Sequence, residues 1–257
     1  MISRLKGKTA FFTGAGSGIG LISSIRLAQE GANVWISDRD LTILEEAKKT
    51  GKAQGVVLNT IEADSTQSDS IKTAIDSISR DSGRIDILVN NAGGSLHTPY
   101  QFLDETDEDW KRVLDLNIMG TVVASRFVLP YMQQQKGGRI INFGSKAGRF
   151  GSLIAGANYA AAKGAISSLT RQLALEFGPY GITVNCICPG IVLTKRTTGL
   201  WESRRTPEER AKVLHEIPLR RHAVAEDISG VVAFFASDDA GFITGATLDV
   251  NGGQGMA

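Results

Sequence analysis

Thr13-Gly-Ala-Gly-Ser-Gly-Ile-Gly20 is the stretch of sequence that decides the fold. It follows the apolar run Thr9 to Phe12 and precedes Leu21, Ile25 and Ala28, which lie at helical spacing. Glycines between a strand and a helix let the backbone approach a pyrophosphate closely, and the helix N-terminus offers unpaired N–H groups and partial positive charge. The stretch therefore predicts a dinucleotide-binding turn, with an ordinary tight turn as the alternative.

Short runs rich in β-branched and aromatic residues recur along the chain, separated by segments with apolar residues at helical spacing. We expect seven strands, at residues 9–13, 33–37, 56–61, 85–90, 139–143, 182–187 and 246–250. This alternation predicts a doubly wound α/β fold of three layers, in which helices cover both faces of a seven-stranded parallel sheet. The 257 residues contain no linker, repeat or break in composition, so we expect one domain spanning residues 1–257.

Residues 194–218 depart from this alternation and form a long excursion from the sheet. Within it, Thr206-Pro-Glu-Glu209 combines an N-cap residue, a proline at the first helical position and a capping-box glutamate, which predicts a helix start. Such an insertion is often a lid over a site, and Trp201 with Leu200 could form its apolar surface. Four basic residues either recognise an anionic substrate or, as we expect, pair with nearby glutamates in solvent: Lys195, Arg196, Arg204 and Arg205.

Composition argues for a small-molecule partner. The 28 basic and 27 acidic residues leave a net charge of +1 without a basic block, so we expect no nucleic-acid partner. The sequence shows neither a signal peptide nor an apolar run of the roughly 18 residues that a membrane span needs. Cys186 and Cys188 would share one strand face as buried thiols, and with the three histidines scattered we expect no metal site and a cytoplasmic location.

The second expected strand ends at Asp38-Arg39, twenty-odd residues beyond the glycine turn. An acid at this point can accept hydrogen bonds from the adenosine ribose hydroxyls and would repel the additional phosphate of NADP. Arg39 argues the other way, because a guanidinium is well shaped to bind that phosphate. We favour NAD over NADP on the strength of Asp38, with a simple loop start as the alternative role of this residue.

Tyr159-Ala-Ala-Ala-Lys163 places a phenol and an ammonium four residues apart. Alanines are strong helix formers, and this spacing brings both side chains to one helix face about one turn apart. A phenol ordinarily has a pKa of about 10, and a neighbouring cation lowers that pKa by stabilising the phenolate. The pair therefore predicts a group that donates or removes a proton near neutral pH, as hydride chemistry on a carbonyl or alcohol requires.

Taken in order, these and further motifs resemble the short-chain dehydrogenase/reductase family over nearly the whole chain. The matching motifs are the turn at 13–20, Asn90-Asn91-Ala92-Gly93, Asn117, Ser145, Tyr159 with Lys163, and Pro189-Gly190. The resemblance implies a Rossmann-type fold and the catalytic set Asn117, Ser145, Tyr159 and Lys163. It also implies a cofactor site built from Gly14, Ser17, Gly18, Ile19, Gly20, Asp38, Arg39, Asp64, Asn91, Ala92, Gly93, Tyr159, Lys163, Pro189, Gly190, Ile191 and Thr194.

The resemblance also implies roles for the catalytic residues. Ser145 would hydrogen-bond to the substrate oxygen, and Asn117 would hold a water that links Lys163 to solvent. One departure is the spacing, since Ser145 precedes Tyr159 by fourteen positions where the family more often shows thirteen. We therefore expect residues 146–158 to bulge and to give the substrate wall an unusual shape.

Roles for the cofactor-binding residues follow from the same resemblance. Asp64 would contact the adenine edge, and Asn91 to Gly93 would line the adenine-ribose side of the cofactor. Ile191 and Thr194 would pack on the nicotinamide and hydrogen-bond to its carboxamide. The substrate would then meet the loop 94–100, the segment 146–153 and the excursion 194–218.

These expectations define an NAD(P)-dependent oxidoreductase that interconverts a secondary alcohol and a ketone, with NAD favoured. A 3-oxoacyl-(acyl-carrier-protein) reductase that uses NADPH is the close alternative, and a non-catalytic dinucleotide sensor is the distant one. The resemblance further implies a homotetramer assembled through the helices expected at 107–135 and 158–177 and the segment 248–253. Ala161, Ala165, Leu169 and Leu173 would then be either core or interface residues.

Overall fold

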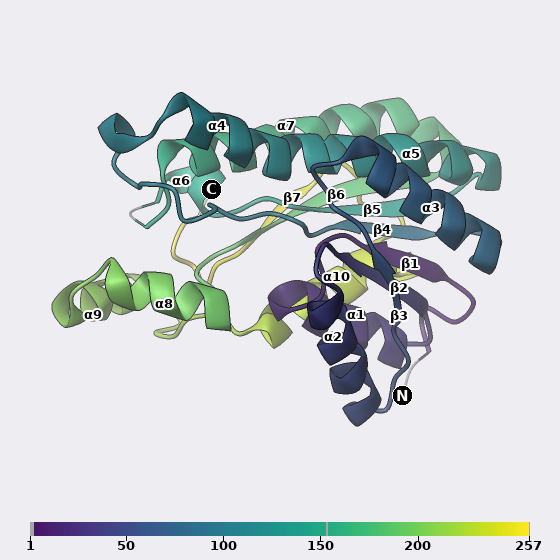
Figure 1. Cartoon of the computed structure of the whole chain (residues 1–257), viewed down its shortest axis with the longest axis horizontal. Helices are drawn as coiled ribbons and strands as arrows, with labels where there is room; N and C mark the ends of the chain where they lie inside the picture. The colour runs from purple at the N-terminus through teal and green to yellow at the C-terminus, as the bar shows by residue number, and fades with distance from the viewer. Residues whose placement is uncertain (1–2, 153, 257) are drawn as a thin grey trace.

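The computed structural model describes residues 3–152 and 154–256, without the side chains of residues 195, 196 and 200. Within these residues, seven strands form one sheet in the order β3-β2-β1-β4-β5-β6-β7, and every ladder is parallel (Figure 1). The strands are β1 (Thr9–Phe12), β2 (Asn33–Asp38), β3 (Asn59–Glu62), β4 (Ile87–Asn90), β5 (Gly138–Phe143), β6 (Ile182–Pro189) and β7 (Thr247–Val250). The expected doubly wound sheet is confirmed.

The third strand begins later than the sequence pattern predicted. Residues 56–58 are not part of β3, and Val57 is 82% exposed. The preceding helix ends in a turn in which Gly55 has a φ of +76° and the Val56 N–H donates to the carbonyl of Gly51. Since β3 lies at the sheet edge and pairs only with β2, these apolar residues are used to bring the chain from the helix to the edge.

Helices cover both faces of the sheet (Figure 1). One layer consists of α1 (Gly18–Gln29), α2 (Leu41–Ala53) and α10 (Ala225–Ala236), and the other of α3 (Ser68–Ser82), α4 (Asp107–Leu114), α5 (Gly120–Gln135) and α7 (Ala157–Phe177). Neighbouring residues of β1 point to opposite faces of the sheet. Phe12 packs into the core beneath the first layer, and Phe11 packs into the core beneath the second. Each buried phenylalanine contributes about 1.5–3 kcal/mol of hydrophobic stabilisation.

Shorter elements connect these layers at the ends of the sheet. They are η1 (Phe102–Asp104), the π-helical turn η2 (Asp115–Met119), α6 (Ala147–Phe150), η3 (Gly178–Tyr180) and η4 (Asp238–Ala240). The excursion after β6 contains α8 (Lys195–Ser203) and α9 (Pro207–Glu216), which project beyond the layers at the left of Figure 1. The predicted start of α9 is confirmed, because Thr206 and Glu209 form a reciprocal capping box.

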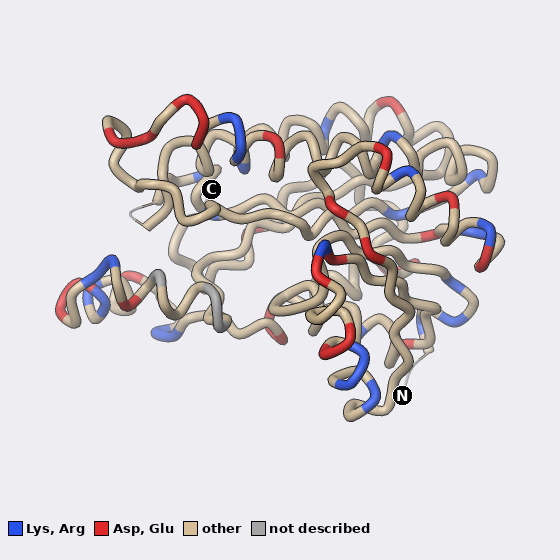
Figure 2. The backbone as a smooth tube through the Cα atoms, viewed as in Figure 1, with Lys and Arg blue, Asp and Glu red and all other residues tan. Residues whose placement is uncertain are grey.

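Charged side chains lie mainly on the outer helices and loops, while the strands are largely tan in Figure 2. One continuous helical stretch, Asp107–Gln135, is long and apolar enough to cross a bilayer by length and composition alone. Half of its apolar window is buried, and α5 packs against α3, β4 and β5. This burial is typical of a helix that covers the core of a sheet.

Candidate active site

The glycine turn after β1 is built against the loop that follows β4. Gly14 and Gly18 have φ values of +57° and +59°, in the left-handed region that favours glycine. A Cβ on Gly14 would lie 2.9 Å from Ala92, and one on Gly20 would lie 2.5 Å from the Asn91 amide nitrogen. The glycines therefore serve close packing between two loops as well as an open approach for a ligand.

Asn91 holds the glycine turn in place. Its side-chain amide donates to the carbonyl oxygens of Thr13 and Gly14 at 3.1 and 2.7 Å. The neighbouring Ala92 N–H donates to the Thr13 hydroxyl at 3.2 Å. Both amide protons of Asn91 are thus used within the protein, so its side chain acts as a strut between β1 and β4.

Ser17 is the N-cap residue of α1, and its side chain makes no capping hydrogen bond. The N–H groups of the first turn, which include those of Ile19 and Gly20, therefore lack the usual side-chain acceptor. A helix N-terminus in this state suits a phosphate, which supplies both an acceptor and a negative charge. The turn fits the pyrophosphate of a dinucleotide.

Asp38 lies at the end of β2 and faces the same turn. A Cβ on Gly16 would lie 3.0 Å from the Asp38 carboxylate and 2.4 Å from the Ile43 side chain, so only glycine leaves room there. Gly16 was not among the predicted cofactor-binding residues, although its place within the glycine run was a usable signal. Arg39 is exposed, and Asp38 accepts a hydrogen bond from the Asp40 N–H at 3.3 Å.

Asp64 lies beyond β3, at the same edge of the sheet as Asp38. The Ala63 N–H donates to the Asp38 carbonyl at 3.0 Å, which joins the ends of the two strands. One oxygen of the Asp64 carboxylate accepts from the Thr66 N–H and hydroxyl at 2.9 and 2.8 Å. The loop geometry thereby orients Asp64, and its second carboxylate oxygen makes none of these bonds.

The turn after β6 closes the same region from the other side. A Cβ on Gly190 would lie 3.0 Å from Asn251, so Pro189-Gly190 packs tightly on the end of β7. Further along, Thr194 lies beside the glycine turn, because a Cβ on Gly18 would be 3.6 Å from the Thr194 methyl group. Residues 176 positions apart in sequence thus meet at one site, as the cofactor prediction requires.

Lys163 occupies a buried position one helical turn after Tyr159 on α7. The residue is 4% exposed, and its ammonium lies 5.8 Å from the centroid of the Tyr159 ring and donates to the Phe143 carbonyl at 2.8 Å. A Cβ on Gly93 would lie 3.0 Å from this ammonium and 2.7 Å from the Asn117 side-chain oxygen. The structure therefore brings together Gly93, Asn117, Tyr159 and Lys163.

Asn117 lies in the π-helical turn η2, between α4 and α5. Its amide donates to the carbonyls of Gly94 and Val113 at 2.9 and 2.8 Å, and its side-chain oxygen accepts from the Gly94 N–H at 3.0 Å. Both amide protons are already donated, so the water that the resemblance assigns to Asn117 would be held by an oxygen of this residue. Single π-turns inside α-helices are frequent at functional sites.

Ser145 follows β5 in a segment that is pinned to β6. The Gly144 N–H donates to the Ile187 carbonyl at 2.8 Å and the Lys146 N–H to the Pro189 carbonyl at 2.9 Å. The Ser145 hydroxyl accepts from the Ala147 N–H at 3.1 Å at the start of α6. This serine is half-buried, on the segment that joins β5 to α6 and α7.

Between Ser145 and Tyr159 the chain forms α6, and the described residues 151, 152 and 154–156 belong to no helix or strand. Arg149 turns toward β7, where its Nε lies 3.0 Å from the Asp249 carboxylate. Burial raises the pKa of Asp249, and the Arg149 cation opposes that rise. Arg149 is thus paired within the protein, Phe150 is 38% exposed, and Leu153 lies outside the described residues.

Cys186 and Cys188 are buried free thiols on one face of β6, as the alternation predicted. Their sulfurs lie 3.9 Å apart, and a Cβ on Gly144 would come within 2.5 Å of Cys188. The contact with Cys186 and burial together raise the pKa of the Cys188 thiol. These thiols fill the space behind the Ser145 loop.

The residues of the excursion are partly where we expected them. Arg205 pairs with Glu209 at 3.2 Å, in line with the expected pairing of its basic residues with glutamates. For Arg204 that expectation is wrong, because its guanidinium donates to the carbonyls of Thr98 and Ile154. The chain reverses between α8 and α9, which directs Arg204 toward the protein. The side chains of Lys195, Arg196 and Leu200 lie outside the described residues.

Trp201 is a buried apolar residue of α8. It is 6% exposed and packs edge-on against His222, with ring centroids 4.9 Å apart at 81°. Burial lowers the pKa of His222, which favours the neutral imidazole beside this indole. The contact joins α8 to the loop 217–223 that follows α9.

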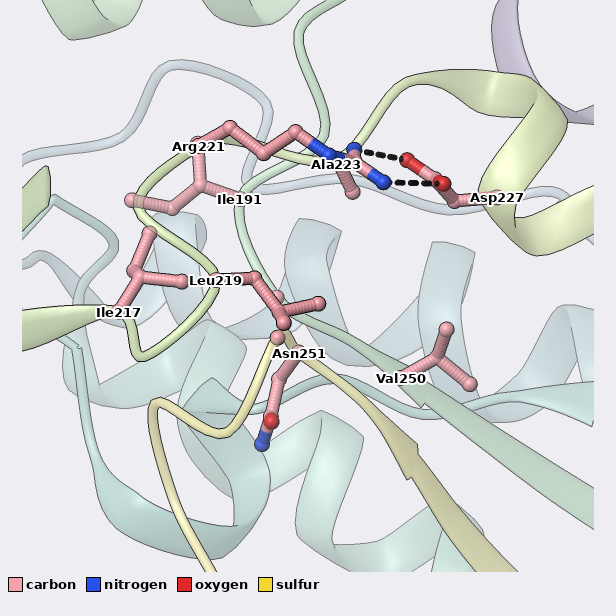
Figure 3. Close-up of a pocket in the computed structure, with 10 residues that line it drawn as sticks. Ile191, Ile217, Leu219, Arg221, Ala223, Asp227, Val250 and Asn251 are labelled. Carbon is pink, nitrogen blue, oxygen red and sulfur yellow. Dashed lines mark hydrogen bonds and ion pairs between the residues drawn. The ribbon is translucent and has the colours of Figure 1, made fainter.

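A pocket of about 170 Å³ lies where the loop after α9 meets the ends of β6 and β7 (Figure 3). Its apolar lining comes from Ile191, from Ile217 and Leu219 of the loop after α9, and from Val250. At its rim Arg221 binds both carboxylate oxygens of Asp227, which holds the pKa of that carboxyl at about 2. None of the predicted catalytic residues is among the ten described residues that line this pocket.

The comparisons with known proteins agree with this geometry. Residues 14–254 match the family model described as enoyl-(acyl carrier protein) reductase. The chain is 38% identical to 2-(S)-hydroxypropyl-CoM dehydrogenase 3 of Xanthobacter autotrophicus, over 99% of both chains. It is 35% identical to a 3-oxoacyl-(acyl-carrier-protein) reductase of Thermotoga maritima, over 97% of this chain and 98% of that protein.

Among solved structures, an NAD⁺-bound xylitol dehydrogenase superposes with a TM-score of 0.90 at 34% identity, covering 97% of this chain and 100% of that one. The chain belongs to the short-chain dehydrogenase/reductase family, as the resemblance predicted. It is an oxidoreductase of the class that binds NAD(P) and interconverts CH–OH and C=O groups.

Substitution at Gly148 tests the contact that positions the Ser145 loop. A Cβ there would lie 2.4 Å from the Gly164 nitrogen and 2.5 Å from the Lys163 carbonyl carbon, which are backbone atoms of α7. Gly148→Ala must push α6 away from α7, and we expect kcat/KM to fall by about 100-fold because small misplacements disrupt catalytic geometry. Steady-state kinetics measure the effect.

Gly230→Ala is the matched control, because a Cβ at this position of α10 has no neighbour within 4 Å. It should leave kcat/KM unchanged and stabilise the protein by about 0.5–1 kcal/mol in thermal unfolding. Equal activity of the Gly148→Ala variant and the wild type would contradict the assigned role of the contact.

Proposed function

We propose that this protein is an NAD-dependent dehydrogenase of small secondary alcohols, with Tyr159 as its acid/base group. The observation that carries the proposal is the Lys163 ammonium, which is buried 5.8 Å from the Tyr159 ring centroid and oriented by the Phe143 carbonyl. A cation in this position stabilises the phenolate form of the tyrosine. The ring is half-buried at the start of α7, so its hydroxyl can meet a substrate.

When bound, the nicotinamide accepts or supplies the hydride. Tyr159 takes the proton from the alcohol hydroxyl during oxidation and returns it to the oxygen during reduction. The Ser145 hydroxyl donates a hydrogen bond to the same substrate oxygen and stabilises the charge that develops on it. Asn117 orients Gly94 and the loop above Lys163, and an oxygen of Asn117 holds the water through which a proton reaches solvent.

The cofactor would occupy the edge of the sheet where the strands end. Its pyrophosphate meets the turn containing Gly14, Ser17 and Gly18 and the start of α1, and its nicotinamide meets Pro189 to Ile191 and Thr194. Its adenosine end lies toward Asp38 and Asp64, with Asn91 to Gly93 beneath the ring system. The room that Gly16 leaves beside the Asp38 carboxylate supports an adenosine ribose at this position.

Tyr159→Phe tests the acid/base role. Loss of the hydroxyl should lower kcat by about 10²–10⁴-fold, the usual contribution of a positioned proton donor, while NADH binding followed by fluorescence stays near the wild-type value. Tyr180→Phe is the control, because Tyr180 is 46% exposed in η3 and packs only beside Phe177. Wild-type turnover by Tyr159→Phe would refute the role.

Cofactor preference tests the function of Asp38. We expect kcat/KM to be higher with NADH than with NADPH, because the carboxylate repels the 2′-phosphate. Asp38→Ser should narrow that ratio by raising kcat/KM for NADPH, since the exposed Arg39 beside it is well placed to pair with a phosphate. A wild-type preference for NADPH would overturn the NAD assignment.

A wild-type preference for NADPH, together with turnover of acetoacetyl thioesters, would favour the 3-oxoacyl-(acyl-carrier-protein) reductase alternative. The sensor alternative would require an incomplete catalytic set. All four residues Asn117, Ser145, Tyr159 and Lys163 are present in this chain, which supports an enzyme. We further propose a cytoplasmic location, with a small molecule rather than nucleic acid or a membrane as the partner.

We also propose a homotetramer in which α5 and α7 form one of the contacts between subunits. Ala161, Ala165, Leu169 and Leu173 are at least partly exposed, although Leu173 also packs against the core beneath α5 and α7. Between the two helices runs a groove of about 270 Å³, lined by apolar residues and by Arg126 and Glu176. Two copies related by a twofold axis could bury these apolar residues against each other and pair the opposite charges.

Light scattering tests the assembly. A tetramer has four times the 27.4 kDa mass of the chain. Leu169→Arg places a third charge among the groove residues and should shift the particle to a smaller mass without unfolding it, because Leu169 is half-buried and, unlike Leu173, does not pack against the core. A wild-type monomer at micromolar concentration would count against the proposed assembly.

A further inference from the structure

Arg204 joins three segments that lie far apart in the sequence. It stands between α8 and α9, and its two terminal nitrogens donate to the carbonyl of Ile154 at 2.7 Å and to that of Thr98 at 3.0 Å. Its guanidinium carbon also lies 5.3 Å from the centroid of the Tyr100 ring. A planar guanidinium holds two donor nitrogens in a rigid fork and can stack on an aromatic face, whereas an ammonium is a compact point charge without that fork.

The carbonyl of Thr98 connects Arg204 to α7, the helix that carries Tyr159 and Lys163. Thr98 is 3% exposed, and its hydroxyl lies 3.3 Å from the side-chain amide nitrogen of Asn158, which is fully buried. The Asn158 side-chain oxygen in turn accepts from the N–H of Tyr159 at 2.6 Å. Hydrogen bonds therefore run from the lid through Thr98 and Asn158 to the backbone of the proposed acid/base residue.

The same point of α7 is held from a second direction. The Glu105 carboxylate accepts from the Asn158 N–H at 3.3 and 3.4 Å, in the first turn of the helix. A negative charge at a helix N-terminus is stabilising. Because Glu105 anchors the backbone of Asn158 independently of the lid, loss of Arg204 should shift the helix start without unfolding it.

The other acceptor, the carbonyl of Ile154, belongs to the segment between Ser145 and Tyr159. Ile154 and Ala155 both donate their N–H groups to the Ser152 hydroxyl at 3.1 Å. These two hydrogen bonds stay within the segment, whereas the hydrogen bond from Arg204 comes from outside it. The guanidinium is thus the tie between this part of the proposed substrate wall and the lid.

We propose that Arg204 is a latch that positions Tyr159 and sets the size of the substrate that this enzyme accepts. With the latch closed, the lid is drawn onto the loops 94–100 and 151–156, which favours compact secondary alcohols over long-chain ones. This inference rests on the proposed function for the substrate class, whereas the closure itself is independent of it. Arg204 touches neither the cofactor site nor the reacting groups described above, and it acts through Thr98 and Ile154.

Arg204→Ala and Arg204→Lys test the latch in the full-length protein. We expect both variants to lose about tenfold or more in kcat/KM for 2-butanol, through kcat because Tyr159 is less well positioned and through KM because the lid no longer closes on the substrate; hydrogen bonds to a charged donor are among the stronger ones in proteins. The ratio of kcat/KM for 2-octanol to that for 2-butanol should rise several-fold in both. Since lysine keeps the charge and cannot reproduce the fork, failure of Arg204→Lys to resemble Arg204→Ala would overturn the geometry.

Lys212→Ala is the matched control, because it removes one positive charge from an exposed position of α9 in the same lid. It should resemble the wild type in KM and in the ratio for the two alcohols.

Thr98→Val removes the hydroxyl while it keeps the carbonyl that Arg204 binds. Its effect on kcat should be smaller in the Arg204→Ala background than in the wild type, because both changes interrupt one path.

Limited trypsin digestion gives a readout that does not depend on activity. Loss of the latch should raise the rate of cleavage within residues 195–212 several-fold, with the thermal midpoint of the whole protein unchanged. Faster cleavage without turnover of any alcohol would support the latch while the proposed function fails. Unchanged cleavage together with an unchanged ratio for the two alcohols would refute the latch even in an active enzyme.

Discussion

The segment Asn91 to Gly94 is the constraint on which both halves of the site depend. On one side, the Asn91 amide fixes the backbone of the glycine turn through the carbonyls of Thr13 and Gly14. On the other, Gly93 lies against the Lys163 ammonium, and Gly94 exchanges two hydrogen bonds with Asn117. Four residues after β4 thus set the position of the proposed cofactor turn relative to the proposed catalytic groups.

Close backbone approach makes this arrangement possible. Gly14, Gly20 and Gly93 lie against neighbouring loops at distances that no Cβ could occupy without displacing them, and Gly148 does the same where α6 meets α7. These contacts carry little hydrophobic stabilisation, because glycine has no side chain to bury. Their effect is geometric: they bring loops from β1, β4 and β5 close enough for short polar side chains to reach across.

Much of the fold could be predicted from the sequence, because periodicity and glycine placement are local properties. The seven strands and the helix start at Thr206 depend on residues within a few positions of each other. The start of β3 was misplaced because the apolar Val56 and Val57 lead to the sheet without pairing in it. Gly16 and Gly148 were missed as close contacts, since the atoms that crowd them come from other elements.

The sequence by itself determined the order of strands and helices, the position of the glycine turn and the helical register of Tyr159 and Lys163, because each depends on neighbours along the chain. Only the tertiary structure decided the partners of Arg204, the strut formed by Asn91 and the contact of Thr194 with the glycine turn. Those contacts join residues separated by dozens of positions or more, and a linear pattern carries no information on how strands and loops are placed in space.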